Sequence, residues 1–344
     1  MSEPRRGRSP RAPTAKAVAE HAGVSVTTVS RVLSGRAEAI PEGTQQRVLA
    51  AARELGYRPN SLAVALRKGV TRTVGLLVPD IGDAYFHQVA RGVEDVAQAA
   101  GYMVVFCNTD RVADKERACV ELLRDKRVDG IVFAGGGIDE DRHLADTPWE
   151  GMHVITIGPH RLGFPAVRVD DAATIETATW HLLDEGCERI LCIAGRRNWL
   201  VSEARLEGYR RALAAAGRDL DPELVVHGDF VHAAGYRAVE EAVSAGVDFD
   251  GVIAFNDYCA VGALEALHEA GRKVPDDVAV VGCDDLALAS LVHPRLSSIA
   301  FSQYDFGRTA MQMILDLASG REIGDTTFPY HLEVRASSRR TGRA

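Results

Sequence analysis

Hydrophobic and polar positions along the chain follow two patterns that meet near residue 72. After that point, short continuous apolar runs alternate with longer stretches in which apolar residues recur at every third or fourth position. Continuous apolar runs are typical of strands covered on both faces, and the recurring pattern is typical of amphipathic helices. Residues 14–59 carry only the helical pattern.

We therefore expect strands at residues 73–80, 102–109, 129–135, 189–195, 224–229, 251–257 and 278–285, and helices at 86–101, 114–127, 173–186, 202–217, 233–246 and 258–271. The helices that end at residues 101, 217, 246 and 271 end in glycine, as the C′ position favours. Two successive sets of alternating strands and helices predict two doubly wound parallel-sheet lobes. Ligands of such sheets bind beyond the carboxyl ends of the strands. The loops at 79–86, 194–205, 255–257 and 282–285 should therefore surround one crevice.

Residues 23–33, GVSVTTVSRVL, are rich in β-branched residues that favour strands, yet they follow a short helical pattern at 14–22. Read as a helix, the segment has Ser25 as N-cap and an apolar face that can pack on the preceding helix. The opposite face has no acidic residue and consists of Val26, Thr27, Ser30 and Arg31. Thr, Ser and Arg can hydrogen-bond to bases and phosphates in a major groove, and a Val methyl can pack on thymine. Gly23 permits the tight turn, so we expect a helix-turn-helix rather than an ordinary helical hairpin.

The charge distribution supports this interpretation. The first 70 residues hold 12 Lys and Arg against 5 Asp and Glu, whereas the other 274 hold 28 against 43. A basic segment joined to an acidic body suggests that the first part meets a polyanion. No apolar run is long enough for a membrane span, and the basic N-terminus has no apolar segment of a secretory signal. We expect a cytoplasmic protein associated with the nucleoid and not with a membrane.

Enzyme chemistry finds little support in the sequence. It contains no Walker A, G-x-S-x-G or H-E-x-x-H motif, and the glycines at 133–137 are not G-x-G-x-x-G. The six cysteines form no C-x-x-C pair and no zinc-type cluster. The adjacent acids Asp170 and Asp171 point to opposite faces if they lie on a strand, and we expect Asp171 to cap the next helix. We therefore expect no enzyme activity, no cofactor and no metal.

Several motifs resemble the LacI/GalR (lactose/galactose repressor) family of bacterial transcription regulators over about residues 14–340. They are TAKAVAEHAGVSVTTVSRVLSG, ELGYRPNSLAVALRKG, TVGLLVPDIGDAYF, RVDGIVFAGG, VIAFND and VPDDVAVVGCDDL. The resemblance implies an N-terminal all-α helix-turn-helix domain and an α/β body of two lobes like a periplasmic binding protein. It also implies an allosteric regulator that binds a palindromic operator in double-stranded DNA as a homodimer and a small-molecule effector between its lobes.

The expected organisation is a disordered basic tail at 1–13, a helix-turn-helix domain at 14–59, a hinge helix and linker at 60–71, and an effector-binding body at 72–344. Its N-lobe should comprise about 72–168 and 296–324, and its C-lobe about 169–295 and 325–340. The final residues, RASSRRTGRA, contain no leucine heptads, so we expect a dimer without the tetramer tail of some relatives.

The resemblance assigns roles to particular residues. Specificity positions fall on Val26 and Thr27, and Arg31 is a base-contacting arginine. The hinge helix runs from Asn60 to about residue 68, and Leu66 is the wedge that enters the minor groove and kinks the DNA.

Effector contacts fall on the four crevice loops, at Tyr85, Phe86, Arg205, Asn256 and Asp284, and Phe230 matches an aromatic wall. Asp83 stands where relatives carry Asn, and Trp199 offers a flat face, or else packs beneath its loop. Gly158 replaces a usual Asp, for which His160 is a possible substitute. Directional polar groups with aromatic platforms suit a sugar or sugar derivative.

Three alternatives remain at this point. The aromatic residues would also suit a purine or nucleoside effector. A solute-binding protein of a transporter shares the two-lobed body, but the helix-turn-helix pattern disfavours it. We expect a repressor, although the residues do not distinguish repression from activation, nor whether the effector weakens or strengthens DNA binding.

Overall fold

The computed structural model describes residues 13–58, 69–135 and 137–340, without the side chains of 138–140. It divides into one unit that ends at Thr71 and a second that begins at Arg72. The expected tail at 1–13 lies outside the described residues except for Pro13, and the expected hinge helix lies outside them almost completely.

The described residues of the small unit, 13–58 and 69–71, form three helices, α1 (Ala15–Ala22), α2 (Val26–Leu33) and α3 (Glu42–Glu54). The Ser25 hydroxyl accepts a hydrogen bond from the Thr28 N–H at 3.1 Å and caps α2 as predicted. Gly23 ends α1 with a φ of 65°, a left-handed conformation that glycine adopts at little cost. The core confirms the predicted packing of α2 on α1 and is formed by Val18, Ala19, Ala22, Val29, Val32, Val48, Ala51 and Ala52.

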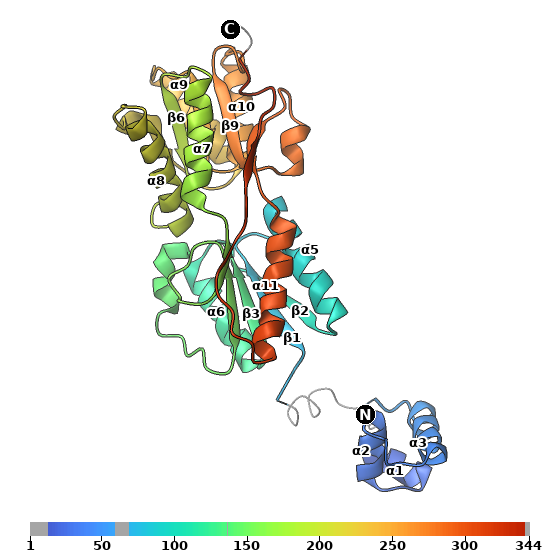
Figure 1. The fold of residues 1–344 in the computed structure, drawn as a ribbon. Helices are drawn as coiled ribbons and strands as arrows, with labels where there is room; N and C mark the ends of the chain where they lie inside the picture. The colour runs from blue at the N-terminus through green and yellow to red at the C-terminus, as the bar shows by residue number, and fades with distance from the viewer. Residues whose placement is uncertain (1–12, 59–68, 136, 341–344) are drawn as a thin grey trace, which may run out of the picture. The chain divides into compact units, whose positions relative to one another are not determined.

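The second unit has two sheets, each flanked by helices (Figure 1). The first has the strand order β11-β5-β4-β3-β1-β2 and is wholly parallel. Its strands are β1 (Thr73–Val78), β2 (Met103–Asn108), β3 (Gly130–Ala134), β4 (His153–Ile157), β5 (Ala166–Arg168) and β11 (Thr326–Thr327). Its helices are α5 (Ala84–Ala99), α6 (Ala113–Asp125), α11 (Gln303–Ala318) and the 3₁₀ helix η1 (Ile138–Leu144). These elements form the N-lobe.

The C-lobe sheet has the order β12-β10-β9-β8-β6-β7, and only β12 runs antiparallel to its neighbour. Its strands are β6 (Ile190–Ala194), β7 (Val225–His227), β8 (Gly251–Ala254), β9 (Ala279–Asp284), β10 (Ser297–Ala300) and β12 (His331–Glu333). Its helices are α7 (Asp171–Asp184), α8 (Leu200–Ala215), α9 (His232–Ser244) and α10 (Asp257–Glu269), with the 3₁₀ turns η2 (Pro222–Leu224) and η3 (Ala287–Ser290). The predicted pair of doubly wound lobes is confirmed.

The chain passes between the lobes at residues 169–170, 301–302 and 328–330. Two expected lobe boundaries were therefore wrong. Strand β10 belongs to the C-lobe because it pairs with β9, although residues from 296 on were assigned to the N-lobe. Strand β11 belongs to the N-lobe because it pairs with β5, although residues from 325 on were assigned to the C-lobe.

Glycines allow three helix pairs to approach closely. A Cβ added to Gly307 of α11 would lie 1.9 Å from the Val89 carbonyl oxygen of α5, and one added to Gly92 of α5 would lie 2.0 Å from the Tyr304 carbonyl oxygen. Gly235 of α9 and Gly262 of α10 make the same reciprocal contact. Gly208 of α8 makes a contact of this kind in one direction, with the backbone of α7. These helices pack by direct backbone contact, which fixes their spacing on each sheet.

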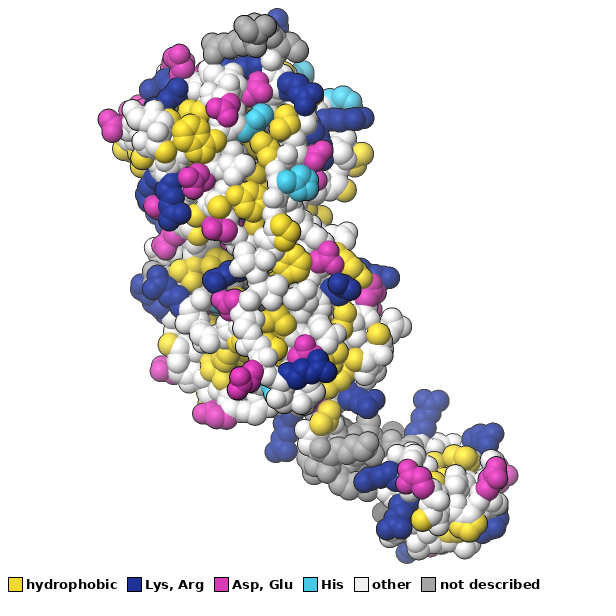
Figure 2. Space-filling view, viewed as in Figure 1, with side chains coloured by type: hydrophobic (Ala, Val, Ile, Leu, Met, Phe, Trp, Pro, Cys, Tyr) yellow, Lys and Arg dark blue, Asp and Glu magenta, His cyan; other side chains and the backbone are white. Residues whose placement is uncertain are grey.

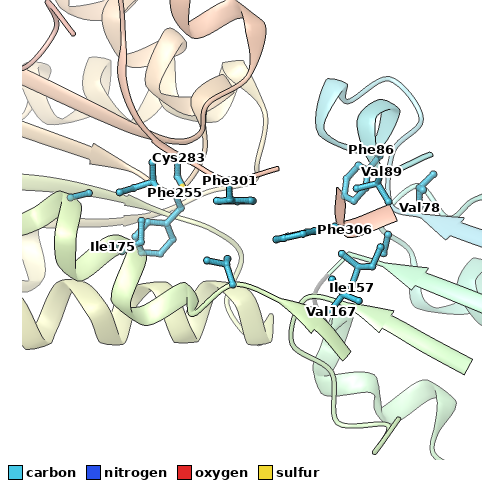
Figure 3. Packing of buried hydrophobic residues seen from close by; sticks show 14 of the residues in the cluster. Val78, Phe86, Val89, Ile157, Val167, Ile175, Phe255, Cys283, Phe301 and Phe306 are labelled. Atoms are coloured by element: carbon cyan, nitrogen blue, oxygen red, sulfur yellow. The ribbon is translucent and has the colours of Figure 1, made fainter. Parts of the chain in front are cut away.

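Buried aromatic residues lie near the crossover from β10 to α11. The rings of Phe301 and Phe306 stack at 5.4 Å with an angle of 13°. Figure 3 shows Phe301 on the side of Phe255 and Cys283, and Phe306 on the side of Ile157. The interlobe region is therefore partly filled by apolar rings.

Candidate functional sites

The outer face of α2 presents the side chains that the sequence predicted. Val26 is 46% exposed, and Thr27 and Arg31 are also exposed. A surface recess is lined by Val26, Thr27, Ser30, Arg31, Ser34 and Arg36. Ser34 and Arg36 were not among the predicted residues of this face, although Ser34 follows Ser30 by one helical turn. Lys and Arg are more numerous than Asp and Glu on the visible face of this unit (Figure 2).

Asn60 and Leu66, the predicted hinge residues, lie outside the described residues. Their roles stay predictions.

A cavity that is open to solvent lies between the two lobes, and about 650 Å³ there, including part of the solvent at its mouth, is not filled by protein atoms. All eight residues predicted to contact an effector line it: Asp83, Tyr85, Phe86, Trp199, Arg205, Phe230, Asn256 and Asp284. They come from five segments that are far apart in the sequence but meet at the carboxyl ends of the strands. Their part in ligand binding stays a prediction.

Arg205, near the start of α8, is buried and has several partners. Its Nε donates to Asp171 Oδ1 at 2.8 Å, and its Nη2 lies 3.5 Å from Asp284 Oδ1. Its Nη1 donates to the carbonyl oxygen of Phe255. These partners hold the guanidinium in one orientation beside the cavity.

Asp171 has a different role from the one expected. The carboxylate of Asp170, not Asp171, caps α7 by accepting a hydrogen bond from the Ala173 N–H at 3.0 Å. Asp171 lies one position further on, so its side chain turns inward to Arg205 and also lines the cavity. Neither acid lies on a strand, as that prediction assumed: Asp170 is exposed at the N-cap and Asp171 is buried in the first turn of α7.

Asp284 combines an unusual backbone conformation with a perturbed side chain. Its φ is 107°, a left-handed conformation that is strained for a residue with a side chain. The buried Oδ1 atom accepts no hydrogen bond within the described structure. Burial raises the pKa of Asp284 to about 7; Arg205 lowers it, and the carboxylates of Asp83 and Asp171 raise it. Perturbed, strained and unpartnered groups are concentrated at functional sites.

Asn256 is the N-cap of α10. Its side-chain oxygen accepts a hydrogen bond from the Cys259 N–H at 3.0 Å, and its Nδ2 donates to the Phe230 carbonyl oxygen at 3.1 Å. The amide therefore fixes the loop that carries Phe230, in addition to lining the cavity.

Aromatic rings form the cavity walls. Trp199 is only 3% exposed and stacks on Phe230 at 5.8 Å with an angle of 23°. Trp199 therefore combines the two expected alternatives: it is packed against Phe230, and it also lines the cavity. Tyr85 meets Phe86 edge to face at 4.9 Å and Phe301 at 6.4 Å.

Arg111 joins the two lobes beside the cavity and was missed from the sequence. Its side chain is 8% exposed and lies 3.6 Å from Asp83 and 3.9 Å from Asp80 in the N-lobe. It also lies 3.5 Å from Asp229 in the C-lobe. Arg196 Nη2 donates to Asp229 at 2.5 Å, so the charged network continues along the C-lobe.

His160 does not line the cavity beside Gly158, contrary to its suggested role. It is buried elsewhere in the N-lobe, with Nδ1 3.1 Å from Asp141 Oδ1. Within the residues described, no group of three or more His, Cys, Asp or Glu side chains is arranged to hold a metal ion. None of the described helices has the length and apolar character to cross a membrane.

A helix-turn-helix unit on the same chain as a two-lobed body with an interlobe cavity defines the class of ligand-responsive DNA-binding regulators. Residues 14–60 match the model of bacterial regulatory proteins of the lacI family. Residues 71–333 match the model of periplasmic binding proteins and the sugar binding domain of the LacI family. The chain belongs to the LacI family, whose members are transcription regulators and not enzymes.

Named relatives agree with this assignment over nearly the whole chain. The chain is 32% identical to the HTH-type transcriptional regulator RegA of Clostridium saccharobutylicum over 93% of this chain and 96% of RegA. It is 32% identical to the HTH-type transcriptional repressor CytR of Escherichia coli K12 over 95% of this chain and 97% of CytR. The solved complex of the transcriptional regulator CelR with cellobiose has a TM-score of 0.71 and 31% identity, and the match covers 95% of this chain and 100% of CelR.

Proposed function

We propose that this protein is a cytoplasmic, nucleoid-associated repressor whose cavity binds a sugar or sugar derivative and thereby controls the affinity of α2 for a palindromic operator. The carrying observation is the cavity, in which polar groups from both lobes are held among aromatic rings. Hydroxyl groups around a sugar ring need directional polar partners, and the faces of the ring pack on aromatic side chains. Ligand contacts to both lobes can bias how the lobes are arranged, which is the basis of allosteric coupling.

The proposed DNA contacts are made by Val26, Thr27, Ser30 and Arg31 in the major groove, and by Asn60 and Leu66 at the hinge. The exposed face of α2, with its one arginine and no acid, supports the first group. The second group rests on the family resemblance alone.

We infer a homodimer, which would place two α2 helices on the two half-sites. Four large apolar side chains support a dimer because they are exposed. Met103 and Phe106 lie on the edge strand β2, Val112 caps the start of α6, and Leu122 lies on α6. Replacing Phe106 with Arg should convert the dimer to monomers in sedimentation experiments and weaken operator binding. Unchanged sedimentation would contradict the use of this surface.

The effector is tested by thermal unfolding of the full chain with pentoses, hexoses, disaccharides and purine nucleosides. All three tryptophans lie after residue 72, so their fluorescence reports on the body alone. A ligand at 100 times its Kd stabilises by about 2.7 kcal/mol, which should raise Tm by several degrees. A stabilising sugar must then also change the affinity for operator DNA. If no sugar raises Tm, the proposal is wrong.

A purine or nucleoside is the second candidate. The stacked Trp199 and Phe230, with Tyr85 on the opposing lobe, would also suit a flat base. Stabilisation by nucleosides but not by sugars would favour it.

A further inference from the structure

The cavity lining carries more acidic than basic side chains, and most of these side chains already have charged partners in the protein. Among the described residues, the lining holds the carboxylates of Asp83, Asp171 and Asp284 and the guanidinium groups of Arg111 and Arg205, with no Lys or His. The acids therefore exceed the bases by one. Whether a negatively charged ligand can bind depends on whether either arginine has a hydrogen-bonding edge to spare.

Arg205 has its donors directed at protein acceptors. Its Nε, Nη1 and Nη2 face Asp171, the Phe255 carbonyl oxygen and Asp284, respectively. A guanidinium that grips a carboxylate or phosphate does so with two parallel N–H groups. The Nε–Nη2 edge, one of the two that could do this, is already directed at carboxylates, so Arg205 holds Asp171 and Asp284 in place.

Arg111 is surrounded by three carboxylates, those of Asp80, Asp83 and Asp229, at 3.5–3.9 Å. Its side chain is 8% exposed. An anionic group beside Arg111 would also lie beside these acids, which offset the attraction of the arginine.

Asp284 is the acceptor that remains open. Its side chain is 7% exposed, and its buried Oδ1 has Arg205 at 3.5 Å but accepts no hydrogen bond. A buried acceptor without a donor costs free energy, which a ligand hydroxyl that donates to the Asp284 carboxylate from the cavity can recover.

We propose that the cavity selects an uncharged, hydroxyl-bearing ligand that donates a hydrogen bond to Asp284, and that it rejects phosphorylated and carboxylated sugars. This inference rests on the proposed function of the cavity as an effector site. The anion would lose part of its hydration in the cavity, where the carboxylates outnumber the arginines once the pH exceeds the pKa of Asp284, about 7. We expect anionic counterparts to bind at least about 100-fold more weakly than the neutral ligand.

The test compares matched pairs with the full chain at pH 8, where Asp284 is ionised: ribose with ribose 5-phosphate, glucose with glucose 6-phosphate and with glucuronate, and adenosine with AMP. Thermal unfolding identifies the compounds that bind, and titration calorimetry gives their Kd values. We expect stabilisation only by uncharged members. Stronger or equal binding of a charged member would overturn this inference and leave the proposed effector site intact. No stabilisation by any compound would overturn the proposed function, and this inference with it.

Two variants locate the cause of the selection. Asp83→Asn keeps an N-cap that serves α5 nearly as well, and Asp284→Asn removes the open carboxylate. Each should narrow the ratio of Kd values within a matched pair by about tenfold or more, because one repelling charge is lost. Asp285→Asn is the matched control, since Asp285 pairs with Arg335 at 2.6 Å and does not line the cavity. Equal ratios in all three variants and the parent protein would refute the electrostatic explanation.

Discussion

Replacing Asp284 with Asn should stabilise the body at pH 8 much more than at pH 5. Asp284 faces Arg205 from α8, Asp171 from α7 and Asp83 from the start of α5, with Cys283 next to it on β9. Burial raises its pKa to about 7, against about 3.9 in an unfolded chain. The asparagine has nearly the same shape but never ionises.

The sign follows from proton linkage. The folded state holds this proton more tightly than the unfolded state, so the raised pKa makes stability fall as pH rises from about 4 to about 7. Each pKa unit corresponds to about 1.4 kcal/mol. The contribution of Asp284 should therefore become less favourable by about 3 kcal/mol between pH 5 and pH 8. The variant should lose this part of the pH dependence.

Urea unfolding of the parent protein and the variant, followed by tryptophan fluorescence at both pH values, gives the four free energies of unfolding that are needed. Asp285→Asn controls for the same replacement one residue away, outside the cavity. If the difference between Asp284→Asn and the parent protein is the same at pH 5 and pH 8, the carboxyl ionises in the folded state as easily as in the unfolded chain, and the reasoning fails.

Three further outcomes are expected. Arg31→Ala should weaken operator binding by about 1–3 kcal/mol and relax the preference at one base pair in a binding-site selection assay; uniform weakening on all sequences would mean that it contacts only phosphate. Gly307→Ala should destabilise the body by about 1–3 kcal/mol in urea, because its Cβ would overlap a carbonyl of α5, whereas Gly324→Ala, which has open space around it, should not. Arg111→Gln and Asp229→Asn should show a coupling energy of about 0.5–3 kcal/mol in a double-mutant cycle of unfolding; additivity would mean that the interlobe ion pair contributes nothing.

The sequence predicted most of the elements that are long and periodic, although the 16-residue helix α11 was not among those expected. Continuous apolar runs identified strands such as β1 and β9, and the glycines after helices marked their ends correctly, with φ values near 70° at Gly101, Gly217, Gly246 and Gly271. It failed for β11 and β12, which have only two and three residues. Strands this short show no periodicity, and only pairing with distant strands reveals their lobes.

The cavity was predicted to a similar degree. Loops after the strands supplied all eight expected lining residues, because the carboxyl ends of parallel strands converge. Arg111 was missed because its partners Asp83 and Asp229 lie far from it in sequence, and no local pattern marks such an ion pair. Asp171 was wrongly expected to cap α7. In the sequence, the capping residue Asp170 and the buried acid Asp171 cannot be told apart until the first residue of the helix is known.

The interlaced order of the two sheets has a consequence for how the protein is made. Strand β11 at residues 326–327 enters the N-lobe sheet, and β12 at residues 331–333 enters the other, so the two sheets are complete only after residues 327 and 333, respectively, have been synthesised. The unit with α2 is complete by Thr71. At about 5–20 residues per second, roughly 10–50 s of synthesis separate these two points. The DNA-contacting unit therefore matures first, and a chain truncated before residue 326 would lose a strand from each lobe.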